Sequence, residues 1–231
     1  MKINLTPTVN YRNFRLSKLN TAEYSHLKWL IFWPIFGILF WLFELFRPAE
    51  DCHVMYHPLD DLIPFCEIFV IPYMFWFVYL VGMYLYTLFY DVDSFRRLMK
   101  FTVITYTATL VIFLIYPTRQ ELRPMEFMRD NILTRFIAGF YQFDSNTNVC
   151  PSIHVIGSAA VCLAGLHAPK LQKLRWKLFF IITMVLICMA TVFLKQHSVL
   201  DVVWALPICA AAYLICWHEP SRHGSLVVEK R

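Results

Sequence analysis

Six long apolar runs alternate with polar segments along the chain, and this alternation predicts the fold. A membrane-spanning helix needs about 20 predominantly apolar residues. The runs lie at about 27–46, 66–90, 101–116, 153–167, 178–194 and 199–217. They predict an all-α polytopic membrane protein. Its six-transmembrane-helix bundle covers residues 27–217, with a basic tail at 1–26 and a second tail at 218–231.

The fourth run is the least hydrophobic of the six, and it is rich in small residues. These are Gly157, Ser158, Ala159, Ala160, Ala164 and Gly165. Small side chains let membrane helices approach one another closely. We therefore expect this span to lie in the centre of the bundle.

The composition agrees with a membrane protein, and the length leaves no room for a second large domain. Of the 231 residues, 58% are hydrophobic and 16% are charged, whereas a soluble domain carries about 25% charged residues. The net charge of +5 does not indicate a nucleic-acid partner, because the basic residues are spread over several loops and form no patch interleaved with aromatic residues. Membrane lipids are the expected surroundings.

The distribution of Lys and Arg predicts the orientation. With both termini on one side, the segments on that side hold 15 Lys and Arg and the opposite segments hold six. Positive residues concentrate in the cytoplasmic segments of membrane proteins. We therefore expect a multi-pass protein of the cytoplasmic (plasma) membrane with both termini in the cytoplasm. The polar segments at 117–152 and 195–198 then share the outer face.

The seven cysteines include no pair with the close spacing of metal ligands. Four lie inside apolar runs, where cysteine is usually a small buried side chain. Cys52, Cys66 and Cys150 lie in or beside segments expected at the outer face, where disulfides can form. A disulfide among these three is a hypothesis.

His197 and Asp201 stand four residues apart at the start of the sixth run. On a helix this spacing places both side chains on one face, one turn apart. The carboxylate would fix the tautomer of the imidazole and leave its other ring nitrogen free as a nucleophile or base. A satisfied polar pair between helices explains the same spacing.

The stretch Pro151-Ser152-Ile153-His154 opens the fourth run. Proline is favoured in the first helical turn, so the N–H groups of Ser152, Ile153 and His154 would be unpaired at the positive end of the helix dipole. Phosphate prefers such a site. Ser152 adds a hydroxyl donor, and His154 is a candidate general acid. A capped helix with an interfacial histidine is the plainer alternative.

Arg119 and Arg123 precede this stretch on the expected outer face, and Lys195 stands next to the His197 turn. Two guanidinium groups can hold phosphate oxygens bidentately. The alternative for such residues is contact with lipid headgroups, which we expect for Arg129 and Arg135, and snorkelling explains Lys195 equally well.

Together these motifs resemble the type 2 phosphatidic acid phosphatase superfamily. The resemblance rests on the Arg-Pro pair at 123–124, the Pro-Ser-Ile-His stretch at 151–154 and the His-x-x-x-Asp stretch at 197–201. It covers about residues 116–201 in motifs and all six spans in layout. It implies a reaction that needs no metal and no cofactor and that passes through a covalent phosphohistidine.

The resemblance also implies a role for each motif residue. His197 would be the nucleophile, Asp201 its orienting partner, and His154 the acid that protonates the leaving alcohol. Arg123 and Ser152 would hold the phosphate.

The chain departs from the family pattern at three positions. Tyr116 stands where the first motif has a basic residue, and Arg119, one helical turn from Arg123, is the candidate substitute. Thr191 stands where the third motif has an arginine, and Ile153 replaces the common glycine of the second.

The expected function is an integral-membrane lipid-phosphate phosphatase that hydrolyses a phosphomonoester, such as phosphatidic acid or an isoprenoid phosphate, at the outer face. Without the second arginine, the site is also similar to the branch that includes inositol phosphorylceramide synthase and sphingomyelin synthase. Those relatives pass the phospho-group to a lipid alcohol, so a lipid phosphotransferase is the alternative. A non-enzymatic lipid-binding or transport protein is a third.

Overall fold

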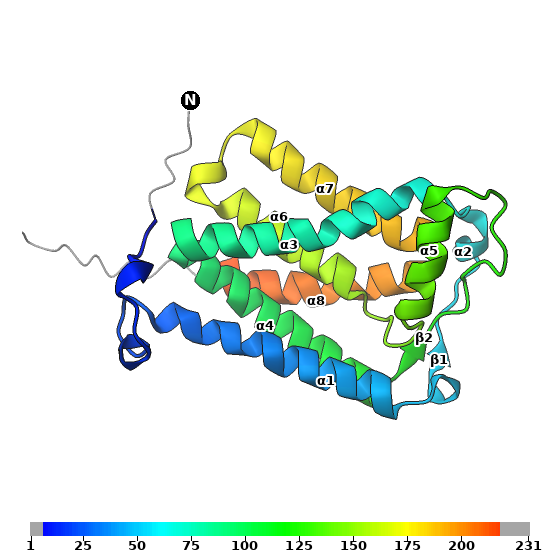
Figure 1. Cartoon of the computed structure of the whole chain (residues 1–231), viewed down its shortest axis with the longest axis horizontal. Helices are drawn as coiled ribbons and strands as arrows, with labels where there is room; N and C mark the ends of the chain where they lie inside the picture. The colour runs from blue at the N-terminus through cyan, green and yellow to red at the C-terminus, as the bar shows by residue number, and fades with distance from the viewer. Residues whose placement is uncertain (1–6, 218–231) are drawn as a thin grey trace, which may run out of the picture.

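The computed structural model describes residues 7–217 as a bundle of helices that run along one long axis (Figure 1). The long helices are α1 (Phe32–Phe46), α3 (Val70–Tyr90), α4 (Val92–Ile115), α6 (Ile153–His167), α7 (Leu174–Phe193) and α8 (Val199–Trp217). Short 3₁₀ turns lie at Tyr11–Asn13, Leu16–Lys18, Ser25–Ile31, Ala49–Asp51, Glu67–Phe69 and Pro169–Leu171. The predicted all-α class is confirmed.

Five helical segments are long and apolar enough to cross a membrane. They are Ser25–Phe46, Glu67–Tyr90, Val92–Ile115, Leu174–Phe193 and Val199–Trp217. Each was expected as a span, and together they indicate a multi-pass membrane protein. Helix α6, the remaining expected span, is apolar but has only 15 residues.

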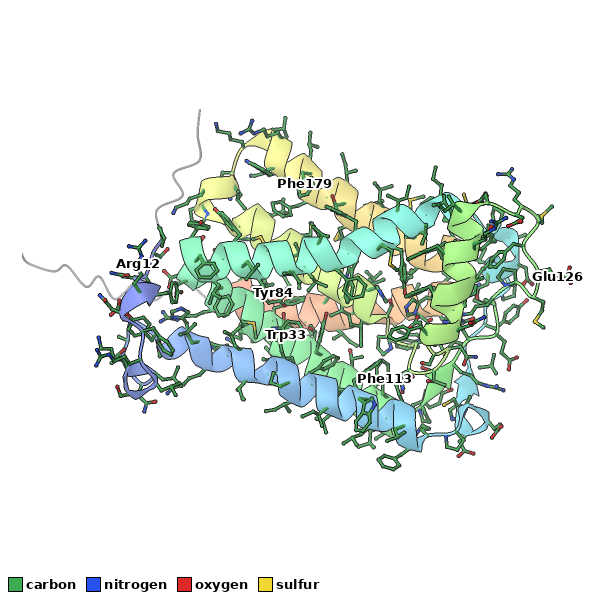
Figure 2. The ribbon with its side chains drawn as sticks, viewed as in Figure 1. Arg12, Trp33, Tyr84, Phe113, Glu126 and Phe179 are labelled. Carbon is green, nitrogen blue, oxygen red and sulfur yellow. The ribbon has the colours of Figure 1, made fainter. Side chains whose placement is uncertain are left out.

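Helix α6 lies in the centre of the bundle, as its small residues predicted, and packs against α3, α4, α7 and α8. Ala160 and Ala164 are buried in its core-facing surface. The closest approach is at Gly165, where a Cβ atom would lie 2.4 Å from the ring of Phe180 on α7. On the opposite side of the bundle, α1 packs through Trp33, whose ring meets Tyr84 edge-on (Figure 2).

We expect Gly165→Ala to lower the thermal stability of the detergent-purified protein. The added methyl group would overlap three atoms of the Phe180 ring, and overpacking of this kind costs about 1–3 kcal/mol. Gly82→Ala is the matched control, since nothing lies within 4 Å of its Cβ position. Equal melting temperatures for the two variants would contradict tight packing of α6 against α7.

Helix α4 begins about nine residues before the expected third run, inside a segment expected as a basic loop. Asp91 caps the helix by accepting hydrogen bonds from the backbone N–H and the hydroxyl of Ser94 at 3.1 and 2.7 Å. Phe95, Leu98 and Met99 are fully buried at helical spacing. The arginines between them concealed this apolar face, so the expectation of a loop at 91–100 was wrong.

The described part of the N-terminal tail folds against the bundle. The N–H of Thr8 donates to the carbonyl of Phe89 at 2.9 Å. The hydroxyl of Tyr11 donates to the carbonyl of Leu88 at 2.6 Å and also meets Nε2 of the buried His26 at 2.7 Å. This segment therefore closes one end of the bundle. The second tail, 218–231, lies outside the described residues.

The opposite end, which we call the α5 end, carries the connecting segments (Figure 1). Strands β1 (His53–Val54) and β2 (Thr118–Arg119) pair there in parallel. The short helix α2 (Leu59–Leu62) lies near them, and α5 (Ile132–Phe143) crosses the ends of the long helices. Helix α5 was not expected within the polar segment at 117–152, although Asn131 and Thr134 form a capping box at its start.

All seven cysteines are free thiols. The hypothesis of a disulfide among Cys52, Cys66 and Cys150 was therefore wrong. Burial raises the pKa of Cys52 and Cys150, so both side chains are buried neutral groups.

Candidate functional site

The HxxxD stretch lies where α7 ends and α8 begins, at the α5 end. Nδ1 of His197 lies 3.0 Å from Oδ2 of Asp201, which also accepts the N–H of Ser198 at 3.0 Å. Asp201 is fully buried in the first turn of α8. The expected contact between histidine and carboxylate is present.

His154 faces the other side of the same imidazole. Its Nδ1 lies 3.4 Å from Nε2 of His197. A carboxylate can only accept, so Asp201 favours the tautomer of His197 that carries its proton on Nδ1. Nε2 then holds a lone pair, and the contact between the histidines requires the proton on Nδ1 of His154. Asp201, His197 and His154 thus form a chain of three groups that the sequence places in two separate motifs.

Aromatic rings of α3 pack against the His154 ring. The ring centroid of Tyr73 lies 4.5 Å from that of His154, and the centroid of Trp76 lies 4.4 Å away. Tyr73 is almost completely buried. This contact could not be predicted, because aromatic residues are frequent throughout the second apolar run.

Ser152 is the N-cap of α6, with its hydroxyl oxygen accepting the N–H of Val155 at 3.4 Å. Pro151 therefore precedes the helix, and its expected place in the first turn was wrong. The N–H of Ser152 donates to the carbonyl of Asp201 at 3.1 Å, and the residue is fully buried. Ser152 thus connects α6 to α8, and its N–H is not free to bind an anion. The expected anion site is reduced to the N–H groups of Ile153 and His154.

Arg123 contacts Gln196, the residue before His197, and all its N–H groups donate within the protein. Nε and Nη2 donate to Oε1 of Gln196 at 3.0 and 2.6 Å. Nη1 donates to the carbonyls of Tyr141 and Asp144 at 3.0 and 2.9 Å, and Nη2 donates to the carbonyl of Ser145 at 2.9 Å. The guanidinium therefore connects the long polar segment to the residue that precedes His197.

The turn before His197 also forms hydrogen bonds with the end of α7. The N–H groups of Gln196 and His197 both donate to the carbonyl of Thr191, at 3.0 and 3.1 Å. The side chain of Thr191 is fully buried and donates to the carbonyl of Cys188 at 2.8 Å. Position 191, where the family pattern has an arginine, is thus a neutral packed position.

Arg119 and Lys195 have partners away from the histidines. Nη2 of Arg119 lies 2.9 Å from Oε1 of Glu121. Nζ of Lys195 donates to the backbone carbonyl of Asp60 at 2.5 Å, and burial lowers the pKa of this ammonium group. Lys195 also has a left-handed backbone, with φ of 54°. Among the described residues, neither cation contacts His154 or His197.

Three carboxylates of the site were not among the candidates. The carboxylate of Asp60 accepts the hydroxyl of Ser198 at 2.6 Å and the N–H of Val199 at 2.8 Å. It therefore fixes the start of α8 from the short helix α2. Nothing in the sequence connects Asp60 to residues so far along the chain.

The second is Asp144, whose Oδ2 lies 3.6 Å from Nη2 of Arg123. Burial raises the pKa of Asp144, and the positive charge of Arg123 opposes that shift. The third is Glu44 on α1, which accepts hydrogen bonds from Thr147 Oγ1 at 3.0 Å and from the side chain of Asn148. A lone carboxylate inside an apolar run was the signal that could have identified Glu44.

A pocket of about 560 Å³ opens at the α5 end, next to the turn that carries His197. Its charged lining residues are Asp61, Glu121 and Lys195, and Phe65 and Leu122 are among its apolar ones. Neither His154 nor His197 is among its lining residues.

Comparison of the chain with protein-family models, curated proteins and solved structures found no match.

Proposed function

We propose that this protein is an integral-membrane lipid-phosphate phosphatase that acts through a phosphohistidine. The observation that carries the proposal is the chain from Asp201 through His197 to His154, with contacts of 3.0 and 3.4 Å. A buried carboxylate, an oriented imidazole and a second imidazole opposite its free nitrogen are the groups that nucleophilic catalysis with a separate proton donor needs.

In the proposed reaction, Nε2 of His197 attacks phosphorus, and the bond from phosphorus to the lipid oxygen breaks. Protonated His154 gives its proton to the departing oxygen, which leaves as the lipid alcohol. Water then attacks the phosphohistidine, passes a proton to His154 and releases inorganic phosphate. Asp201 stabilises the positive charge that forms on His197. A phosphoryl group does not fit in a gap of 3.4 Å, so the His154 ring turns away from Nε2 when substrate binds.

Two features support phosphate binding next to the histidines. The N–H groups of Ile153 and His154 lie at the N-terminus of α6, where backbone donors and the helix dipole favour an anion. The guanidinium of Arg123 adds positive charge one side chain away, through Gln196. With both termini in the cytoplasm and six spans, this site faces the outer side of the cytoplasmic membrane.

A lipid phosphotransferase is the second candidate, and Thr191 is the observation that favours it. Its buried, neutral side chain leaves no cation at the position where the phosphatase pattern has an arginine. The resemblance associates such a site with transfer to a lipid alcohol instead of water.

The test is a panel of lipid phosphates given to purified protein in the presence of a chelator, with and without an added lipid alcohol. We expect free phosphate from at least one lipid, unchanged by the chelator. Phosphate that appears only on the added alcohol would favour the transferase. An absence of both products, with a correctly folded protein, would favour a non-enzymatic lipid-binding or transport role.

A further inference from the structure

Helix α5 presents three different surfaces along its length. One faces the bundle and includes the buried residues Thr134 and Ile137. Ile137 packs in a cluster with Val70, at the start of α3, and with Leu194, just after α7. Helix α5 therefore lies at the level where these two long apolar helices end, and it crosses them (Figure 1).

The second surface is an exposed apolar stripe. Ile132, Phe136 and Phe143 are 82%, 50% and 91% exposed. At 3.6 residues per turn, these three positions fall within about 40° of one another around the helix axis. Aromatic and aliphatic side chains so exposed would be unfavourable in water.

The third surface is polar and lies beside the apolar stripe. Arg135 and Gln142 are exposed and fall roughly 60° to 100° from the stripe around the axis. Arg135 is held by Asp130 through two contacts of 2.7 and 2.8 Å. Helices that lie in a membrane interface have an apolar stripe toward the lipid chains and a polar stripe toward water.

The loop that leads into α5 continues the apolar stripe. Met125 and Met128 are fully exposed, and Figure 2 labels Glu126 between them at the far end of the molecule. Arg129 follows directly, and its Nη1 lies 3.4 Å from Oε1 of Glu67. Ile68, in the adjacent 3₁₀ turn before α3, and Ile71, in the first turn of α3, are also exposed. The apolar surface therefore continues from the membrane-crossing part of the bundle.

We propose that α5 and the loop before it form an interfacial element that binds the lipid bilayer, with Ile132, Phe136 and Phe143 among the acyl chains and Arg135 at the headgroups. Lipid is favoured over a protein partner because the apolar stripe is continuous with the exposed apolar surface at the start of the span that begins at Glu67, and because a polar stripe runs parallel to it. The proposal rests on the multi-pass character of the chain and not on phosphatase activity.

The C-terminal end of α5 connects this element to the histidines. Tyr141 donates its hydroxyl to the carbonyl of Leu194, and its own carbonyl accepts from Arg123. Arg123 in turn holds Gln196, next to His197. The position of α5 at the lipid surface is thereby coupled to the segment that carries the histidine.

The test is nitroxide labelling of the full chain in lipid nanodiscs. Phe136→Cys and Phe143→Cys report the apolar stripe, and Gln142→Cys on the same helix is the matched control for the polar stripe. The labelled wild-type chain corrects for its own cysteines, most of which are buried. Relaxation by oxygen, which enters lipid, is compared with relaxation by a water-soluble nickel complex.

We expect oxygen to be the stronger relaxant at positions 136 and 143 and the nickel complex to be the stronger one at position 142. Equal access of the nickel complex at all three positions would overturn the proposal. Immobilised labels at 136 and 143, with spin–spin broadening that disappears on dilution with unlabelled protein, would also overturn it, because a second copy would then cover the stripe. The measurement does not use activity, so its failure leaves the proposed function untouched.

Discussion

Replacing His197 with alanine is expected to lower lipid-phosphatase activity by roughly 10³- to 10⁶-fold, the range seen when a principal catalytic group is removed. Uncatalysed phosphate-monoester hydrolysis is among the slowest reactions known. An acid or base alone contributes only about 10²–10⁴, so loss of the nucleophile cannot be compensated by His154. The measurement is phosphate release together with trapping of an acid-labile phosphoprotein, which should disappear in the variant.

The control must separate chemistry from folding. In His197→Ala, the carboxylate of Asp201 still accepts the hydrogen bond from the N–H of Ser198. We therefore expect the variant to remain folded, and a thermal unfolding measurement checks this. His167→Ala is the matched control, because His167 lies at the other end of α6, beside Tyr213 and Trp217. A folded His197→Ala protein with full activity would exclude the phosphohistidine.

The second large effect is expected at Arg123. If the guanidinium acts as a brace for Gln196, Arg123→Ala and Gln196→Ala should lower kcat by similar factors, on the order of 10- to 100-fold, and leave KM nearly unchanged. Hydrogen bonds to charged groups contribute about 1.5–3 kcal/mol each, which sets this range. Arg123→Lys should not restore activity, because an ammonium cannot reproduce the fork that holds Gln196 and three carbonyls.

A double-mutant cycle distinguishes this brace from a phosphate ligand. For a brace, the double variant should be no worse than either single variant, since both substitutions remove the same contact. For a direct phosphate ligand, Arg123→Ala should raise KM strongly, Gln196→Ala should not, and the two effects should add. The second pattern would return Arg123 to the role that the family resemblance implies.

Most of the bundle could be predicted from the sequence because its signal is local. The bounds of α6 and α8 agree with the expected runs, since Ser152 and Ser198 mark the change from polar to apolar residues. The contact of His197 with Asp201 follows from helical spacing alone. The meeting of His154 with His197 required only that both motifs lie at one end of the bundle.

What could not be predicted depends on tertiary contacts. Arg123 has the residue type expected of a phosphate ligand. Its guanidinium instead donates to backbone carbonyls of the long polar segment, and no local sequence pattern predicts how that segment folds. Nothing in the sequence around Asp60 distinguishes it from other acidic residues of the connecting segments. Its hydrogen bonds with residues at the start of α8 could therefore not be predicted. Helix α5 was obscured because its apolar stripe is narrow and its flanking residues are polar.

The hydrogen bonds of Asp60 have a consequence for how the protein can be divided. A fragment that begins at α6 would contain His154, His197 and Asp201, and thus every group of the proposed chemistry. It would lack Asp60 and Arg123, which hold the turn around His197 from two earlier connecting segments. The residues of the proposed chemistry therefore lie in the last third of the chain. The contacts that hold the turn around His197 also come from earlier segments. The proposed chemistry would therefore require the complete bundle.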